Sequence, residues 1–279
     1  MALIHLFRDC NQRCVFCSYP QAPEPRPSLK DWLKEIAAMP PGLVQVSGGE
    51  PLLAGADALC LLVGAASRLG RPVELQTNAL AAASLPERDL ARLARALKAA
   101  GGYFNVNFPA ATAAADYRIT RAPGGFAARK AGVARLLASG APVRLTCVVS
   151  SLNFRSLPAW AALVRREFAG AAWVQFSYIK GIGRAAGGGL APAYRAAAPY
   201  LLKALASLEE AGLPCEVDHI PPCRLGRFAG LNVDMEKMRA GRPGPHLEEK
   251  AHVAACRGCR YIKLCPGPRK DYMETHRNI

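Results

Sequence analysis

The chain has 279 residues and is 51% apolar, which is enough for one substantial α/β domain with a small appendage, or for one large barrel. Its net charge of +15 attracts anionic partners, but no Lys/Arg block interleaved with aromatic residues marks a nucleic-acid track, so nucleic acid is not an expected partner. No apolar run reaches the roughly eighteen residues of a membrane span, and the N-terminal MALIHLFRDC is too short and polar for a signal peptide, so a cytoplasmic location is expected.

Short apolar β-type runs alternate with segments of helical period, which predicts six consecutive βα units around a parallel sheet. The predicted strands are Ala2–Phe7, Leu43–Ser47, Pro72–Gln76, Tyr103–Phe108, Val143–Val149 and Trp173–Ile179. The predicted helices cover residues 28–38, 52–69, 86–100, 125–139, 157–168 and 195–212. Six units are too few for a complete eightfold barrel and fit a partial one.

Local signals support several helix ends. Ser84 with Pro86 and Glu87 predicts a helix start, and glycines follow the predicted helices at Gly70, Gly101, Gly140 and Gly212. After the sixth strand, the glycine-rich residues 181–190 indicate a junction.

Ten cysteines in such a chain indicate metal ligands rather than disulfides, because six of them form two tight clusters. The first strand runs directly into Cys10, Cys14 and Cys17, in a loop of the kind where α/β barrels place their chemistry. Four-iron clusters usually take four thiolates, and three would leave one iron open to a small molecule. A zinc knuckle is the alternative, although zinc requires a fourth ligand.

This C-x3-C-x2-C spacing, with Phe16 just before the third cysteine, resembles the hallmark of the radical S-adenosylmethionine (SAM) superfamily. The resemblance implies that the open iron binds SAM and that one electron cleaves its sulfonium bond to a 5′-deoxyadenosyl radical, which abstracts hydrogen from substrate. It also implies an external electron donor of the flavodoxin or ferredoxin type.

Further motifs resemble the SAM-binding segments of that superfamily. Gly48, Gly49 and Glu50 match its Gly-Gly-Glu motif after the second strand, where glycines admit a close backbone approach and the carboxylate accepts from an ammonium group. Thr77 and Asn78 match a Thr-Asn-Gly segment, with Ala79 in place of glycine. The remaining implied SAM contacts are Asn107 for a ribose hydroxyl, Arg118 and Arg121 in a loop for the carboxylate, and Asn153, which otherwise caps a turn.

The second cluster, Cys256, Cys259 and Cys265, resembles the end of the auxiliary-cluster domains called SPASM and, in shorter form, Twitch. The expected fourth ligand is Cys223, with Cys215 as the alternative; Cys60 and Cys147 lie in apolar runs and are expected in the core. A structural zinc site has the same four-thiolate chemistry and stays open. Seven Lys or Arg against two acids in residues 250–279 favour an anionic cluster or substrate there.

We therefore expect an α/β protein: a partial (β/α)6 TIM-like barrel over residues 1–190 and a small Twitch-like domain over residues 191–279. The expected cofactors are SAM and two [4Fe-4S] clusters, one that binds SAM and one auxiliary. The expected function is a radical SAM oxidoreductase that acts on a peptide or protein side chain, with Arg184 as a weaker candidate for substrate contact. Alternatives are a nucleotide or cofactor precursor as substrate, an iron-sulfur electron-transfer protein, or a zinc-organised nucleic-acid-binding module.

Overall fold

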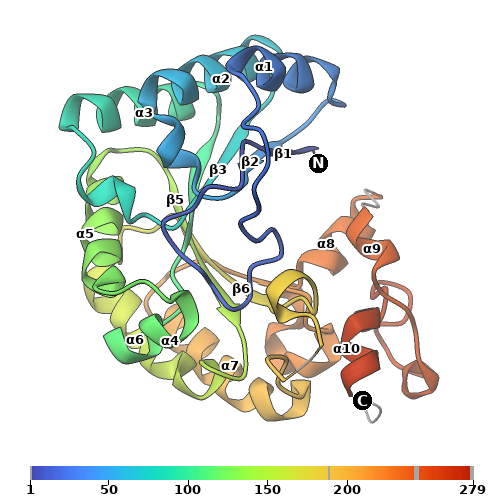
Figure 1. The fold of residues 1–279 in the computed structure, drawn as a ribbon. Helices are drawn as coiled ribbons and strands as arrows, with labels where there is room; N and C mark the ends of the chain where they lie inside the picture. The colour runs from blue at the N-terminus through green and yellow to red at the C-terminus, as the bar shows by residue number, and fades with distance from the viewer. Residues whose placement is uncertain (1, 188, 242–244, 277–279) are drawn as a thin grey trace.

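The computed structural model describes residues 2–187, 189–241 and 245–276. Met1, residue 188, residues 242–244 and residues 277–279, which belong to the two predicted domains, lie outside this range. Helices surround the convex side of one sheet, and the C-terminal helices lie beyond one edge of it (Figure 1). Within the described residues, no helix is long and apolar enough to cross a bilayer.

All strands of the sheet are parallel, and their order follows the chain from β1 to β7, with β1 and β7 at the two edges. The strands are β1 Ala2–His5, β2 Val44–Ser47, β3 Val73–Thr77, β4 Tyr103–Asn107, β5 Val143–Val149, β6 Trp173–Tyr178 and β7 Cys215–Asp218. The predicted open α/β barrel is confirmed. The structure adds a seventh strand, which pairs Val174 with Cys215.

Ten α-helices occur within the described residues. They are α1 Leu29–Ala38, α2 Ala56–Arg68, α3 Glu87–Ala99, α4 Ala113–Thr120, α5 Gly125–Ala138, α6 Leu157–Glu167, α7 Tyr194–Glu210, α8 Val233–Arg239, α9 Pro245–Glu248 and α10 Lys270–Thr275. Helix α4 occupies a segment that the sequence predicted as a loop. Its mixed pattern hides the helix, although Thr112 caps it by accepting from the Ala115 N–H.

The helix-end predictions succeeded at the glycines and failed at Ser84. All four predicted terminal glycines have left-handed backbone, with φ between 64° and 78°. The N-cap of α3 is Pro86, and no side chain caps this helix end. The prediction that Ser84 is the N-cap is therefore wrong. The capping box instead lies at α1, where the Ser28 and Asp31 side chains bond to each other's backbone N–H groups.

The two faces of the sheet have opposite character. Residues such as Val46, Leu75, Val106 and Phe176 are fully buried under the helices. The residues that alternate with them point into the concave side and are mostly polar: Gln45, Glu74, Gln76, Asn105, Asn107, Arg144, Thr146, Gln175 and Glu216. The barrel therefore encloses a polar interior, which suits a charged cofactor or substrate better than an apolar core would.

A buried ion pair anchors that interior. Glu74 is 1% exposed, and it accepts hydrogen bonds from Arg144 at 2.8 Å, from the Tyr103 hydroxyl at 2.6 Å and from Asn105 at 2.8 Å. Burial raises the pKa of Glu74, but the Arg144 charge and these hydrogen bonds outweigh it and hold the pKa below the ordinary 4.5.

We predict that Arg144→Ala lowers the free energy of unfolding by about 3–5 kcal/mol at pH 7, because it leaves a buried carboxylate unpaired. Since the folded-state pKa of Glu74 lies below its unfolded value, the stabilisation is present above pH 4.5 and is lost as the pH falls through the lower folded value. Urea titrations should show the difference from wild type narrowing below that pH. Adding Glu74→Gln should recover part of the loss; no recovery would mean that the pair is not the cause.

Candidate functional site

The loop after β1 carries the three N-terminal cysteines across the C-terminal ends of the strands and is fastened at several points. The Arg13 and Val15 N–H groups donate to the Thr120 and Ile119 carbonyls, both at 2.9 Å, at the end of α4. Phe16 packs against the small apolar cluster of Ala110, Ala115 and Ile119. The aromatic residue of the motif is therefore an anchor for the loop.

The Gly-Gly-Glu segment after β2 holds the beginning of the same loop by backbone hydrogen bonds. The Gly49 N–H donates to the Phe7 carbonyl at 2.6 Å, and the Glu50 N–H donates to the Asp9 carbonyl at 2.8 Å. A Cβ on Gly49 would lie 1.8 Å from the Asp9 oxygen, and one on Gly48 would lie 2.6 Å from the Phe7 oxygen. Both glycines are required because no side chain fits where the two backbones meet.

A third attachment comes from the turn after β6. The Arg184 backbone donates to the Cys17 carbonyl at 2.9 Å, and its guanidinium donates to the Cys14 carbonyl at 3.4 Å. Gly183 has φ +60° and would place a Cβ 2.3 Å from the Cys17 oxygen. Arg184 thus holds the cysteine loop by two hydrogen bonds. The two segments are more than 160 residues apart in the chain, and the sequence did not indicate this contact.

The three thiols share one loop: after burial, which is the largest cause, Cys17 contributes to the raised pKa of Cys10, and Cys10 and Cys17 contribute to that of Cys14. Burial raises the pKa of Cys10 to about 11 and that of Cys14 to about 12, and the Cys14 thiol donates to the Gln12 side chain at 3.2 Å. Among the residues that the structure describes, no three His, Cys, Asp or Glu side chains converge as a ready metal site. Three thiols in one loop still match the ligands of an iron-sulfur cluster, and binding would release their protons.

Glu50 and the segment after β3 form one hydrogen-bonded unit. The Glu50 carboxylate is 1% exposed and accepts from the Thr77 hydroxyl at 2.6 Å and from the Asn78 N–H at 2.7 Å. The Asn78 amide donates to the Asn11 side chain at 2.7 Å and lies 3.8 Å from the Cys10 sulfur. Thr77 and Asn78 therefore reach the cysteine loop partly through Glu50.

Ala79, where the resemblance predicted glycine, has φ +62°. Its methyl group is accommodated because Gly132 on α5 lies opposite, where an added Cβ would be 3.2 Å from it. The strained backbone is thus kept without glycine.

A buried arginine that the sequence did not single out lies beside this unit. Arg129 on α5 is fully buried, pairs with Asp116, and affects the pKa of both Cys14 and Glu50. Its Nε and Nη2 atoms are buried without a hydrogen-bond partner, as is Oδ1 of Asn107 at the end of β4. These groups fit a ligand that carries a carboxylate and hydroxyls. The sequence held no signal that distinguishes Arg129, because Lys130 and Arg135 lie on the same helix.

The other predicted SAM contacts lie differently. Arg118 and Arg121 are exposed on α4 and at its C-terminus, not in a loop. The Asn153 side chain is committed within the protein: its amide donates to the Pro109 and Val148 carbonyls, both at 2.8 Å, and its oxygen accepts from the Ser150 N–H at 2.8 Å. It ties the ends of β4 and β5 together, and it makes no side-chain cap hydrogen bond to the turn that follows, although the turn-capping alternative predicts one.

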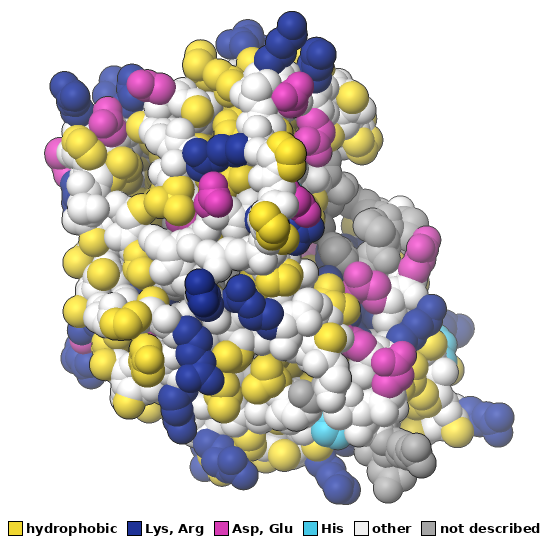
Figure 2. Space-filling view, viewed as in Figure 1, with side chains coloured by type: hydrophobic (Ala, Val, Ile, Leu, Met, Phe, Trp, Pro, Cys, Tyr) yellow, Lys and Arg dark blue, Asp and Glu magenta, His cyan; other side chains and the backbone are white. Residues whose placement is uncertain are grey.

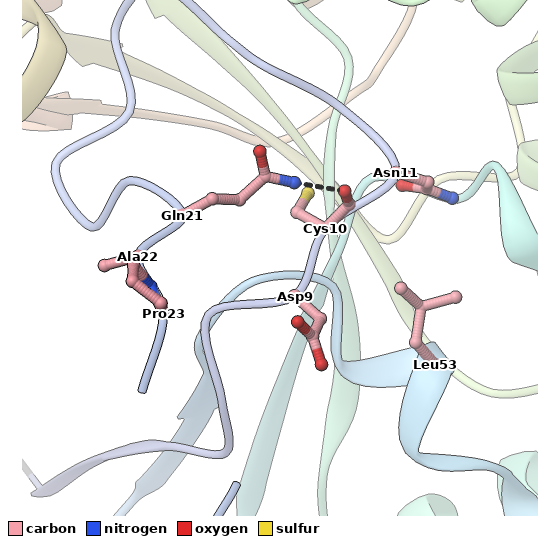
Figure 3. Close-up of a pocket in the computed structure, with 7 residues that line it drawn as sticks. All are labelled: Asp9, Cys10, Asn11, Gln21, Ala22, Pro23 and Leu53. Atoms are coloured by element: carbon pink, nitrogen blue, oxygen red, sulfur yellow. Dashed lines mark hydrogen bonds between the residues drawn. The ribbon is translucent and has the colours of Figure 1, made fainter. Parts of the chain in front are cut away.

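A hollow of about 540 Å³ opens beside Cys10 (Figure 3). Its lining comes from the cysteine loop, from exposed Leu53, and from a proline-rich strap of residues 18–28 that includes Gln21, Ala22 and Pro23. The Gln21 amide donates to the Cys10 carbonyl, as the dashed line in Figure 3 shows. Solvent thus reaches the loop from this side.

The C-terminal cysteines gather around a second hollow, of about 60 Å³. Its lining includes Cys223, Cys256, Cys259 and Cys265. Cys215 instead lies in β7, where its thiol contacts the Leu213 carbonyl at 3.4 Å. His252, which the sequence did not single out, also lines the hollow, and its Nε2 lies 2.6 Å from the Cys265 carbonyl oxygen. Of the two candidates for a fourth ligand, Cys223 is the one that shares this hollow.

We predict that Gly49→Ala displaces the cysteine loop, lowers stability by about 1–3 kcal/mol, and reduces the iron bound after anaerobic reconstitution. Gly170→Ala is the matched control, because nothing lies within 4 Å of an added Cβ there. Iron analysis and thermal denaturation of both variants give the comparison. Equal iron content in the two variants would contradict the steric argument.

Comparisons with known proteins bear on the fold and on the family. No curated protein sequence matches the chain. The structure is similar to anSMEcpe with bound AdoMet and Kp18Cys peptide, at 13% identity and a TM-score of 0.70 over 100% of this chain and 91% of that one. It is also similar to Streptococcus suis SuiB bound to S-adenosylmethionine, at 12% identity and a TM-score of 0.66 over 98% and 73% of the two chains. A third similarity is to the FeFe-hydrogenase maturase HydG from Carboxydothermus hydrogenoformans, at 16% identity and a TM-score of 0.60 over 83% and 56%.

At these identities the structural matches show the fold alone, and in one SuiB structure the chain spans only 48% of its counterpart. The sequence model of the Radical SAM superfamily matches residues 4–158, more than half of the chain, including the cysteine loop and the Gly-Gly-Glu segment. Membership implies an enzyme that uses SAM and a [4Fe-4S] cluster. The chain belongs to the radical SAM superfamily.

Proposed function

We propose that this protein is a radical SAM oxidoreductase that abstracts hydrogen from a peptide or protein side chain. The observation that carries the proposal is the cysteine loop, which is bonded to the Glu50 backbone and lies within electrostatic reach of buried Arg129. Bound there, the cluster and SAM supply one-electron cleavage of the sulfonium bond and a radical that abstracts hydrogen.

The chain's own residues have distinct tasks in this proposal. Cys10, Cys14 and Cys17 hold the cluster, and the Gly48–Gly49–Glu50 segment accepts from the ammonium group of SAM. The unpartnered N–H groups of Arg129 bind the SAM carboxylate, the role that the sequence assigned to Arg118 and Arg121. The free Oδ1 of Asn107 accepts from a ribose hydroxyl.

The substrate class rests on the polar interior and on two structural neighbours. SuiB has been solved with its precursor peptide SuiA, and anSMEcpe with the Kp18Cys peptide. In this chain Asn105, Thr146 and Gln175 lie on the concave side of the sheet, where they are hydrogen-bonded to one another and to Glu74 and Glu216. A concave side built of polar groups suits a polar substrate such as a peptide better than an apolar one.

We further propose an auxiliary [4Fe-4S] cluster in a Twitch-like domain over residues 191–279, held by Cys223, Cys256, Cys259 and Cys265. The shared hollow supports this assignment. Burial raises the pKa of Cys265 to about 11, and the Gly267 N–H donates to its sulfur at 3.3 Å, a contact that would stabilise a thiolate ligand. A cluster with four thiolates is suited to electron transfer.

Iron and sulfide analysis tests the cluster count. We expect about eight irons in the reconstituted protein and about four when either the three N-terminal or the three C-terminal cysteines are replaced by alanine. Cys215→Ala is the control that should keep the full count. Four irons plus one zinc would leave the N-terminal site intact and overturn the auxiliary cluster. With SAM and dithionite, the wild type should form 5′-deoxyadenosine. A protein that binds no iron and forms no product would contradict the proposal that it is an enzyme of this kind.

The role of Arg129 is tested against its partner, because removing the arginine alone would strand buried Asp116. We expect Asp116→Asn with Arg129→Gln to weaken SAM binding by about ten- to a hundredfold relative to Asp116→Asn alone, as befits the loss of a charge-assisted hydrogen bond. Equilibrium binding of SAM to reconstituted protein measures the difference. Equal affinities would show that Arg129 is only structural.

A further inference from the structure

Four exposed side chains form a patch where the cysteine loop meets the C-terminal half of α4. The patch, here called the α4 face, consists of Arg13, Tyr117, Arg118 and Arg121. Tyr117 is 49% exposed, which is unusual for a large aromatic side chain. Arginine and tyrosine are the residue types enriched where proteins bind one another.

The three arginines are free of ion pairs within the described chain, although many other arginines of this protein are paired. Arg92, Arg135 and Arg227, for example, are partly exposed and each contacts a carboxylate. The acid on α4 itself, Asp116, is buried and committed to Arg129. The patch is therefore an uncompensated positive surface, and Figure 2 shows Lys and Arg side chains gathered over α4.

The helix dipole does not account for this arrangement. Cations near a helix C-terminus are favourable, which would explain Arg118 and Arg121 alone. The helix dipole does not explain why Arg13, which belongs to the cysteine loop, and the exposed Tyr117 lie beside them. Arg121 also has φ +56°, a left-handed conformation that is uncommon for a residue other than glycine.

The α4 face lies directly against the candidate cluster loop. Arg13 precedes Cys14 in the chain, and its backbone N–H is bonded to the Thr120 carbonyl at 2.9 Å, next to Arg121. A partner seated on these side chains would rest on the same loop that carries the three cysteines. Since Arg129 offers buried, unpartnered N–H groups beside Glu50, the exposed arginines are left without a task in SAM binding.

We propose that the α4 face docks an acidic one-electron carrier protein of the flavodoxin type, which delivers its electron to the site held by Cys10, Cys14 and Cys17. The inference rests on the proposed function. The carrier is oxidised by one electron and the cluster site is reduced by one, with no proton or group transferred. Opposite charges steer the encounter, and the exposed aromatic side chain of Tyr117 supplies contact area.

The test compares three charge-reversal pairs, each three residues apart. Arg118→Glu with Arg121→Glu alters the α4 face. Arg95→Glu with Lys98→Glu is the matched control on α3, whose side chains are likewise exposed and near a helix C-terminus. Arg257→Glu with Arg260→Glu alters the exposed basic residues beside the C-terminal cysteines.

Two readouts are needed. The first is the Kd for oxidised flavodoxin, measured with reconstituted protein at low and high salt, which does not depend on turnover. We expect the α4 pair to raise this Kd at least about tenfold at low salt and to flatten its salt dependence, while the α3 pair changes it little. Tyr117→Ser should weaken binding without changing the charge.

The second readout is 5′-deoxyadenosine formation, driven either by reduced flavodoxin or by dithionite. The α4 pair should lose only the flavodoxin-driven rate. If the α4 pair also lost the dithionite-driven rate or SAM affinity, Arg118 and Arg121 would have a role in SAM binding, and the inference would be overturned. Equal effects of all three pairs, or an effect of the C-terminal pair alone, would overturn it as well. If wild type fails with dithionite, the proposed function has failed, and the binding readout still judges the docking face.

Discussion

The structure depends on the way one loop is held across the open end of the sheet. The cysteine loop meets the backbone after β2 at Gly48 and Gly49, the end of α4 at Thr120, and the turn after β6 at Gly183. At three of these contacts a single Cβ would collide with a carbonyl oxygen. The thiols are therefore positioned by backbone packing from three separate βα units, and a shift in any of them would move the site.

The interior of the barrel follows a second constraint, which is that buried charges must be paired. Glu74 with Arg144 and Asp116 with Arg129 are both removed from solvent, and each lies on or next to the concave side of the sheet. In the first pair Glu74 accepts from neighbouring hydroxyl and amide groups, and one guanidinium atom of Arg144, Nε, has no hydrogen-bond partner. In the second pair two guanidinium atoms of Arg129, Nε and Nη2, have none, so that pair has the larger binding capacity left.

The arginines of this basic chain divide by burial into different tasks. Arg144 and Arg129 act inside the fold, Arg184 grips the cysteine loop, and Arg13, Arg118 and Arg121 face solvent. A net charge of +15 is thus not a uniform property of the surface. Where the charge is uncompensated and adjoins the candidate site, it is available to a partner of opposite charge.

The sequence by itself determined the order of the strands, the open parallel barrel and the spacing of the N-terminal cysteines. These features are local, because hydrophobic period and ligand spacing are read within a few residues. It missed α4, whose mixed pattern lacks a strong apolar face, and it did not place the β-type run that holds Cys215, which is β7, in the sheet. The sequence favoured Cys223 over Cys215, and the tertiary structure shows that Cys223 is the one that shares the C-terminal hollow. Only the tertiary structure separated buried Arg129 from exposed Arg118 and Arg121. The reason is that the burial of a side chain, and the convergence of several side chains on one site, depend on contacts between residues distant in the chain. The sequence pattern shows which residue types are present, but not which of them are removed from solvent on folding.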